Sequence, residues 1–408
     1  MQRDLPFLST QSVATATGVL AAITNAHALS ETERDRLESA YGALGSHLTE
    51  HEVFKNVTLE VHPQGSMLLG TTTRPEGKVE IDVDLVVLLV QKLNERIESA
   101  ALLSTLYEVV KEHTDRHDLG IHLKRRCVQI EYAGSMHADA TPIVHSPHAY
   151  DRYGDTYAVV PDRDLSRYLG TNPKGYGKWF FEAAALMPTF RMYRAIGELT
   201  AKADVMPLPS LEVFDRLLAR IVQLFKIHRN ICFADNNDFC PPSCLITTLV
   251  AHAYRRAVQH TFDSPLDLIL AIWQDMPTYI RREPLANGRE RWTLDNPTAA
   301  GDNLADRLNE GNRQHQFNAW YLRFQDDFLE LIEQANSRQG VAALSARVKK
   351  SYGDKSARGI ATAMTQMANR QRGAQRIIVP TAIASGAGST AAPSIGMASQ
   401  THRFFGRH

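Results

Sequence analysis

A Gly-Ser pair, followed sixteen residues later by the first of two spaced aspartates, constrains this chain more than any other feature. Gly65-Ser66 follows an alternating stretch at residues 57–61, which predicts a strand. Asp82 and Asp84 open an aliphatic run over residues 80–90 that predicts a longer strand, covered on both faces beyond Asp84. Side chains alternate along a strand, so both carboxylates are expected on one face of it.

This pattern favours one kind of ligand. Neighbouring carboxylates repel each other unless a cation lies between them, and hard oxygen ligands of this kind suit Mg²⁺ bound together with substrate phosphates. Gly65 lets backbone N–H groups approach a phosphate, and Ser66 adds a hydroxyl donor. Arg74 and Lys78, in the connecting loop, are placed to neutralise a triphosphate. The segment therefore predicts a site for a nucleoside triphosphate and metal ions.

A pair of metal ions needs a third acid. Asp139 is the best candidate, because it lies on a short predicted strand over residues 138–144 and has small neighbours. Glu131 alternates differently and Asp151 falls in a predicted loop, so both are poorer candidates. With Asp139 drawing the proton from a 3′-hydroxyl, the residues predict in-line displacement at an α-phosphorus and release of pyrophosphate. Two Mg²⁺ ions are expected as cofactors, with Mn²⁺ as an alternative.

The chain is expected to divide into an α/β half and a helical half. Residues 1–150 are predicted to form a catalytic core with N-terminal helices. Residues 150–178 are rich in Gly, Pro, Asp and Tyr, which predicts a loop-rich connection over residues 151–210. Residues 211–375 are predicted to be a helical lobe, and residues 376–408 a flexible tail of small and polar residues.

Bulk composition narrows the partners and the compartment. Lys plus Arg equals Asp plus Glu at 45 each, so no net field attracts a long nucleic acid. No apolar stretch approaches the ~20 residues of a membrane span, and Met1-Gln2-Arg3-Asp4 lacks a signal-peptide layout. Four cysteines are too few for a disulfide framework, which favours a cytoplasmic protein.

Two spaced pairs in the second half raise the question of zinc. His228 and Cys232 are four residues apart, as are Cys240 and Cys244. Structural zinc sites usually pair Cys-x₂₋₄-Cys with a matching second pair, and helical cysteines are commonly small buried hydrophobes. The spacing therefore favours packing over metal binding.

The Gly-Ser pair, the paired acids and the later acid resemble the signature of the Pol β nucleotidyltransferase superfamily. The longer match from Gln64 to Val86 is similar to one subgroup, the bacterial cGAS/DncV-like nucleotidyltransferases (CD-NTases). The resemblance implies an α+β fold, in which a Pol β-like core of mixed sheet and helices joins a helical C-terminal lobe of the OAS/cGAS type. The active site is then expected in the cleft between core and lobe.

The resemblance also assigns residues. In the family, a helix lysine and a following serine contact the donor triphosphate, which here implies Lys226 and Ser243. Gln64, Gly65 and Ser66 are expected to complete the nucleotide site. The family makes cyclic di- or trinucleotide messengers for anti-phage defence (CBASS), with ATP among its substrates. The resemblance further implies a regulatory HORMA-type protein, or a ubiquitin-like conjugation enzyme that acts on the C-terminal tail.

Two other functions stay open at this point. One is a linear oligoadenylate synthase or another NTP transferase that acts on RNA or protein, although the neutral charge disfavours long RNA. The other is a non-catalytic nucleotide-sensing scaffold, which the presence of all three acids and Lys226 disfavours.

Overall fold

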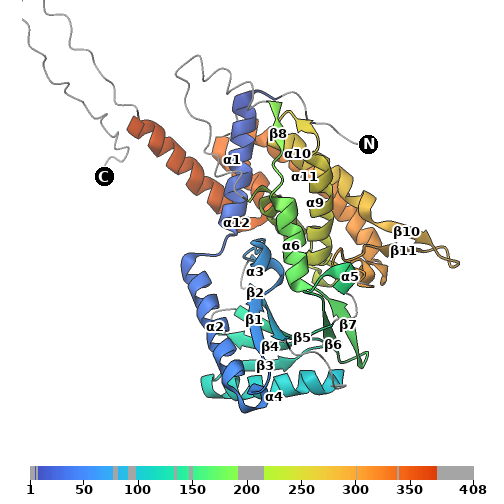
Figure 1. The fold of residues 1–408 in the computed structure, drawn as a ribbon. Helices are drawn as coiled ribbons and strands as arrows, with labels where there is room; N and C mark the ends of the chain where they lie inside the picture. Colours follow the sequence, from blue (N-terminus) through green and yellow to red (C-terminus); the bar gives the residue numbers. More distant parts are fainter. Residues whose placement is uncertain are drawn as a thin grey trace, which may run out of the picture.

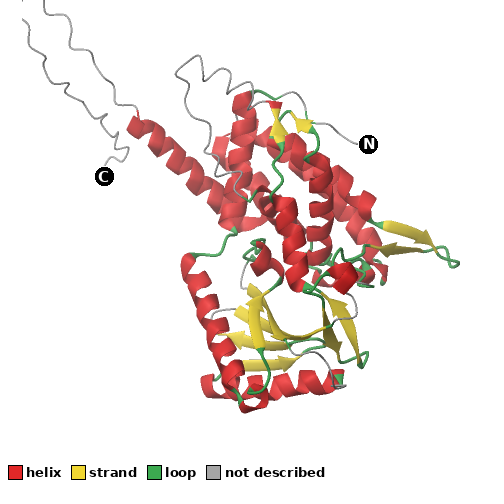
Figure 2. Ribbon diagram, viewed as in Figure 1, coloured by secondary structure: helices red, strands yellow, loops and turns green. Residues whose placement is uncertain are grey.

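The computed structural model describes residues 5, 8–76, 81–90, 98–132, 136–146, 150–191, 216–299, 301–337 and 340–374, without the side chains of residues 81–82, 150–151 and 366–374. Lys78, residues 192–210 of the predicted connection and the predicted tail lie outside the described residues. Figures 1 and 2 show a sheet-containing lobe below a lobe made almost entirely of helices.

The first lobe is built on a seven-stranded mixed sheet with the order β1-β2-β5-β4-β3, in which β6 pairs with β5 and β7. Only β2 and β5 run parallel among its neighbouring strands. The seven strands are β1 (Leu59–Pro63), β2 (Ile81–Leu89), β3 (Gly120–Leu123), β4 (Val128–Tyr132), β5 (Met136–His145), β6 (Ala158–Asp162) and β7 (Arg167–Thr171).

Alternation along β2 decides which face of the sheet carries the acids. Val83, Leu85 and Val87 are buried against two helices, α2 (Glu31–Glu50) and α4 (Ser99–His117). Beyond Asp84, the opposite face is also covered, because Val86 and Leu88 pack against Val160 and Ala158 of β6. The expected two-sided burial of this strand is confirmed, and only its first part can face a ligand.

The second lobe surrounds α8 (Leu217–Cys232), which is buried along most of its length. The helices that contact α8 include α6 (Pro173–Ala184), α9 (Ser243–Ala257), α10 (Pro265–Asp275), α11 (Arg313–Asn336) and α12 (Gly340–Ala374). A short hairpin, β10 (Arg281–Pro284) and β11 (Glu290–Thr293), projects from it, and β8 (Thr189–Phe190) pairs with β9 (Thr261–Phe262).

The first helix, α1 (Thr10–Ala26), belongs to the second lobe by its packing. Its buried residues, among them Val13, Leu20 and Ile23, join the same apolar core as α8 and α11. Figure 1 shows α1 beside α12, away from the sheet. The sequence predicts N-terminal helices as part of the catalytic core, whereas α1 packs on the helical lobe; sequence order does not specify which partner buries an apolar helix face.

The prediction of a loop over residues 150–178 is wrong. This stretch forms a short helix, α5 (Tyr150–Tyr153), the strands β6 and β7, and the start of α6. Two local features in the sequence indicate the start of α6. Asn172 caps the helix by accepting a hydrogen bond from the Gly175 amide at 2.9 Å, and Pro173 occupies the first helical position. The strands form because they extend the sheet from β5, which composition cannot reveal. In the described ranges, no helix combines the length and apolar character needed to cross a bilayer.

Candidate active site

Two carboxylates lie side by side at the centre of the sheet. Asp84 on β2 is the register partner of Asp139 on the parallel strand β5, and both line a cavity between the lobes. Gln129 on β4 is the next partner across the sheet and donates from Nε2 to Asp139 Oδ1 at 3.0 Å. Asp82 precedes Asp84 on β2, while its side chain lies outside the described residues. The predicted pairing of a β2 acid with Asp139 is thus present.

The Gly-Ser pair approaches Asp84 so closely that only glycine fits. Gly65 opens the short helix α3 (Gly65–Leu69) with a φ of 54°, and a Cβ added to it would lie 2.4 Å from Asp84 Oδ2. The following Ser66 lines the cavity, and its Oγ accepts from Thr72 Oγ1 at 3.1 Å. The absence of a side chain at position 65 therefore lets the serine and the carboxylate share one wall.

Lys226 faces this wall from the helical lobe. Its side chain lies on α8, is only 4% exposed, and donates from Nζ to the Thr71 carbonyl at 2.9 Å. Burial, assisted by the nearby Arg229 charge, lowers the pKa of Lys226 to about 7. A cation in this position is costly without an anionic ligand, which is a property expected of a phosphate-binding group.

Arg229 is a functional candidate that the sequence reading missed. It lines the same cavity, is 7% exposed, and donates from Nη1 to Pro241 O at 2.7 Å and to Ser243 Oγ at 3.1 Å. Ser243, at the start of α9, is thereby fixed at the cavity wall. The signal for Arg229 was available, because it lies three residues after Lys226 and therefore on the same face of a helix.

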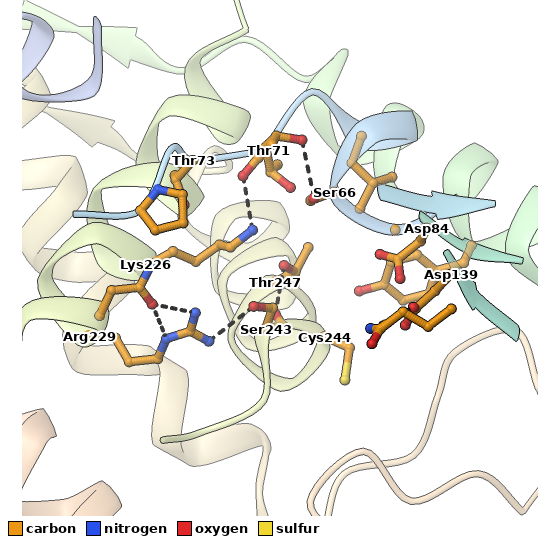
Figure 3. Close-up of a pocket in the computed structure, with 17 residues that line it drawn as sticks. Ser66, Thr71, Thr73, Asp84, Asp139, Lys226, Arg229, Ser243, Cys244 and Thr247 are labelled. Atoms are coloured by element: carbon orange, nitrogen blue, oxygen red, sulfur yellow. Dashed lines mark hydrogen bonds between the residues drawn. The ribbon is translucent and has the colours of Figure 1, made fainter. Parts of the chain in front are cut away.

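The cavity measures about 420 Å³, within the range of small-molecule sites. Figure 3 shows Asp84 and Asp139 on one side of it, with Lys226, Arg229 and Ser243 across from them. The cleft between the two lobes is therefore where the fold brings the predicted residues together. Its lining residues are Gly65, Ser66, Leu69, Thr71, Thr72, Thr73, Pro75, Asp84, Gln129, Asp139, Tyr176, Lys226, Arg229, Asn230, Ser243, Cys244 and Thr247.

Two predicted ligand contacts lie elsewhere. Gln64 is not among the lining residues; its backbone N–H donates to Asp84 O at 2.8 Å, and its Nε2 donates to Thr141 Oγ1 at 3.4 Å. The Arg74 guanidinium, expected to neutralise a triphosphate, instead pairs with Glu33 on α2. Arg74 does not line the cavity, so its role as a phosphate ligand is not supported.

The histidine and cysteine pairs serve different purposes. His228 is fully buried, its Nε2 donates to Asp327 Oδ2 at 2.9 Å, and its Nδ1 accepts from Trp320 Nε1 at 3.1 Å. Cys244 does not follow the expectation of a buried hydrophobe, because it is exposed and lines the cavity. Within the described ranges, no three His, Cys, Asp or Glu side chains are arranged to hold a metal ion.

Nucleotide binding above neutral pH is expected to take up a proton at Lys226. Above pH 7 much of this amine is neutral in the free protein, and an adjacent triphosphate raises its pKa and recharges it. Affinity for a nucleoside triphosphate is therefore expected to fall as pH rises through this range. Titration calorimetry at pH 8 in buffers of different ionisation enthalpy measures the uptake.

Lys226→Met provides the control for this titration. It is expected to remove most of the buffer dependence and to weaken triphosphate binding on the order of 10–100-fold, since hydrogen bonds to charged groups are worth about 1.5–3 kcal/mol. The stability of the nucleotide-free protein is expected to change with pH in the opposite direction to the affinity. Between about pH 7 and 10.5 the unfolded chain holds a proton on Lys226 that the folded chain has lost, so the free energy of unfolding rises with pH in this range. Equal enthalpies in all buffers for the wild type would contradict a lowered pKa.

Comparison with known proteins places this geometry in a family. Residues 20–183 match the SMODS family, the Second Messenger Oligonucleotide or Dinucleotide Synthetase domain. A c-di-GMP synthase from Roseivirga ehrenbergii is 30% identical over 294 residues, which cover 70% of this chain and 71% of that protein. The cyclic dinucleotide synthase CdnG from Bradyrhizobium diazoefficiens is 29% identical over 210 residues, or 48% of each chain.

Solved structures agree on the fold. Bradyrhizobium diazoefficiens CdnG in complex with GTP matches with a TM-score of 0.61 and 20% identity, over 87% of this chain and 99% of that one. Vibrio cholerae DncV, the cyclic AMP-GMP synthase, matches with a TM-score of 0.52 and 15% identity, over 85% and 86%. Taken with the paired acids and the cleft between two lobes, these relationships show that the chain belongs to the CD-NTase family and is a nucleotidyltransferase of the cyclic oligonucleotide synthase type.

Proposed function

We propose that this enzyme condenses two nucleoside triphosphates, at least one of them GTP, into a cyclic dinucleotide with release of pyrophosphate. One observation carries the proposal: the register-paired carboxylates of Asp84 and Asp139 face the buried cations Lys226 and Arg229 across one cavity. The acids suit the reacting end of a triphosphate and the cations suit its charge. The relatives named for c-di-GMP and cyclic dinucleotide synthesis, and the complex of CdnG with GTP, support guanine in the product.

The helical lobe and the sheet have different roles in this reaction. On the helical side, Lys226, Arg229 and Ser243 bind the donor triphosphate and offset its charge in a site from which most water is excluded. On the sheet side, Ser66 orients the phosphates, and Asp139, beside Asp84, accepts the proton of the attacking 3′-hydroxyl. Holding both reactants between these walls removes most of the entropic cost of their encounter.

The donor set at the sheet fits a divalent cation. Asp84 and Asp139 lie in register on adjacent strands and line the cavity, and Gly65 has no side chain that would crowd Asp84, so hard carboxylate oxygens are grouped where an ion could bind. Asp84 and Asp139 would hold Mg²⁺ or Mn²⁺, and Asp82 is proposed to complete the set. When bound, the ions supply Lewis-acid stabilisation of the phosphorane oxygens and of the leaving group.

The biological setting belongs to the same proposal. We propose a role in anti-phage signalling within the cytoplasm, with a HORMA-type protein as a regulator. The HORMA-type regulator is supported by a fold neighbour, the CdnC:HORMA complex from E. coli MS115-1, which matches with a TM-score of 0.55 over 85% of this chain. The anti-phage role and the compartment are predictions from the family resemblance. Conjugation through residues 376–408 remains a prediction from the resemblance.

Labelled GTP and ATP, alone and together, with Mg²⁺ or Mn²⁺ provide the test. After phosphatase treatment, a resistant product that migrates as a cyclic dinucleotide and contains guanine is expected. A ladder of phosphatase-sensitive products would favour a linear oligonucleotide synthase instead. No product from any nucleotide pair, in the presence of a HORMA-type partner as well as without one, would overturn the proposal.

A further inference from the structure

The loop that joins the Gly-Ser motif to the central strand touches the cavity and the last helix at once. This segment, Gly70–Glu76, is called the donor loop below. On its inner side, Thr71, Thr72, Thr73 and Pro75 line the cavity. The α8 side chains fix its backbone there: Gln223 Nε2 donates to Thr72 O at 3.0 Å and to Gly70 O at 3.3 Å, and Lys226 donates to Thr71 O.

The outer end of the donor loop is bound by a break in α12. Gly353 interrupts this helix with φ 87° and ψ 174°. The helix then restarts, and the amide of Lys355 donates to Glu76 Oε1 at 2.7 Å, while Lys355 Nζ donates to Pro75 O. A Cβ on Gly353 would lie 2.3 Å from Glu76 Oε1. The glycine therefore both permits the break and leaves the space that the carboxylate fills.

His27 closes the same junction from α1. Its Nδ1 donates to the Arg74 carbonyl at 2.7 Å, and the Arg74 amide donates to His27 O at 2.7 Å. The other ring nitrogen, Nε2, lies at hydrogen-bond distance, 3.0 Å, from Ser356 Oγ. His27 is 2% exposed and Ser356 is fully buried. Three consecutive residues of the donor loop, 74–76, are thus tied to helices of the second lobe.

We propose that Glu76 and Lys355 are positioning residues for nucleotide binding, which hold the donor loop in the shape that places Lys226 and the loop threonines against the triphosphate. The inference rests on the proposed function, because it takes the nucleotide to occupy this cavity. The Thr71 carbonyl sets where Lys226 Nζ lies, and the loop is fixed at both ends, so a loosened outer end displaces the inner one. Small displacements of binding groups have large effects on substrate positioning.

Four variants separate positioning from general stability. Glu76→Ala removes the acceptor for the Lys355 amide, and Lys355→Met removes the bond to Pro75 O while keeping the side-chain stem. Glu76→Gln keeps an oxygen at the same place and serves as the rescue. Lys350→Met, an exposed position on the same helix, is the matched control. For Glu76→Ala and Lys355→Met, KM and the GTP dissociation constant are expected to rise about tenfold with kcat within about twofold.

Hydrogen exchange of the Thr71–Thr73 amides, measured without nucleotide, tests the loop independently of catalysis. Faster exchange in Glu76→Ala, restored in Glu76→Gln and absent in Lys350→Met, together with the raised KM, supports the inference. Unchanged exchange overturns it, and so does faster exchange with an unchanged KM. Failure of the wild type to bind GTP would instead overturn the proposed function, while the exchange rates would still decide whether Glu76 holds the loop.

Discussion

Replacing Asp84 by asparagine is expected to lower cyclic dinucleotide formation by on the order of 10³-fold. Asparagine keeps the shape of the side chain, so it still fits beside Gly65, but it lacks the negative charge that would hold a cation next to Asp139. Release of pyrophosphate and chromatography of the product measure the loss. Asp139→Asn is expected to behave in the same way, because Asp139 is the register partner of Asp84.

These substitutions lower activity, but they are not expected to lower the stability of the folded protein. Two carboxylates in register repel each other in the absence of a cation, so removing one charge is expected to leave the melting temperature unchanged or slightly higher. Glu131→Gln is the matched control: it lies on β4 of the same sheet, is exposed, and pairs with His122 at 2.7 Å instead of facing the cavity. The control should retain activity within about twofold. An active Asp84→Asn protein would contradict the assignment of the catalytic acids.

The catalytic strand was predictable because its information is local. A period of two residues places Asp84 opposite the buried residues Val83 and Leu85, and that alternation holds in the fold. The motif itself, a Gly-Ser pair followed by two spaced acids and a later acid, can be recognised from the order of residues without knowledge of the fold. The resemblance then supplied Lys226 and Ser243, which the cavity also contains.

What could not be predicted depends on contacts between distant segments. Gln129 reaches Asp139 only because β4 pairs with β5 in one register, and no local pattern specifies that register. The Gly, Pro and Tyr content of β6 and β7 predicts a loop, and these segments form strands only because β5 provides an edge with which β6 can pair. In the same way, Arg74 was assigned to the phosphates by its charge, and only the folded chain reveals Glu33 as its partner.

Gly65→Ala is expected to lower synthesis by on the order of 10²-fold with a modest loss of stability. The left-handed backbone at φ 54° costs an alanine about 1 kcal/mol, and its Cβ would lie 2.4 Å from Asp84 Oδ2. Since no Cβ sits that close to an oxygen, either the carboxylate or α3 must move. Both are parts of the site, so the displacement reaches Ser66 and Asp84 together. Steady-state kinetics and thermal unfolding of the purified variant measure the two effects.

The chain offers a matched control for this substitution at Gly42. That glycine lies within α2, and a Cβ added to it would meet nothing within 4 Å. Gly42→Ala is therefore expected to keep full activity and to stabilise the protein by about 0.5–1 kcal/mol, as alanine does in a helix interior. A second comparison locates the damage: if Gly65→Ala acts by displacing Asp84, adding it to Asp84→Asn should cost little further activity. Wild-type rates for Gly65→Ala would show that the close approach to Asp84 is not needed for catalysis.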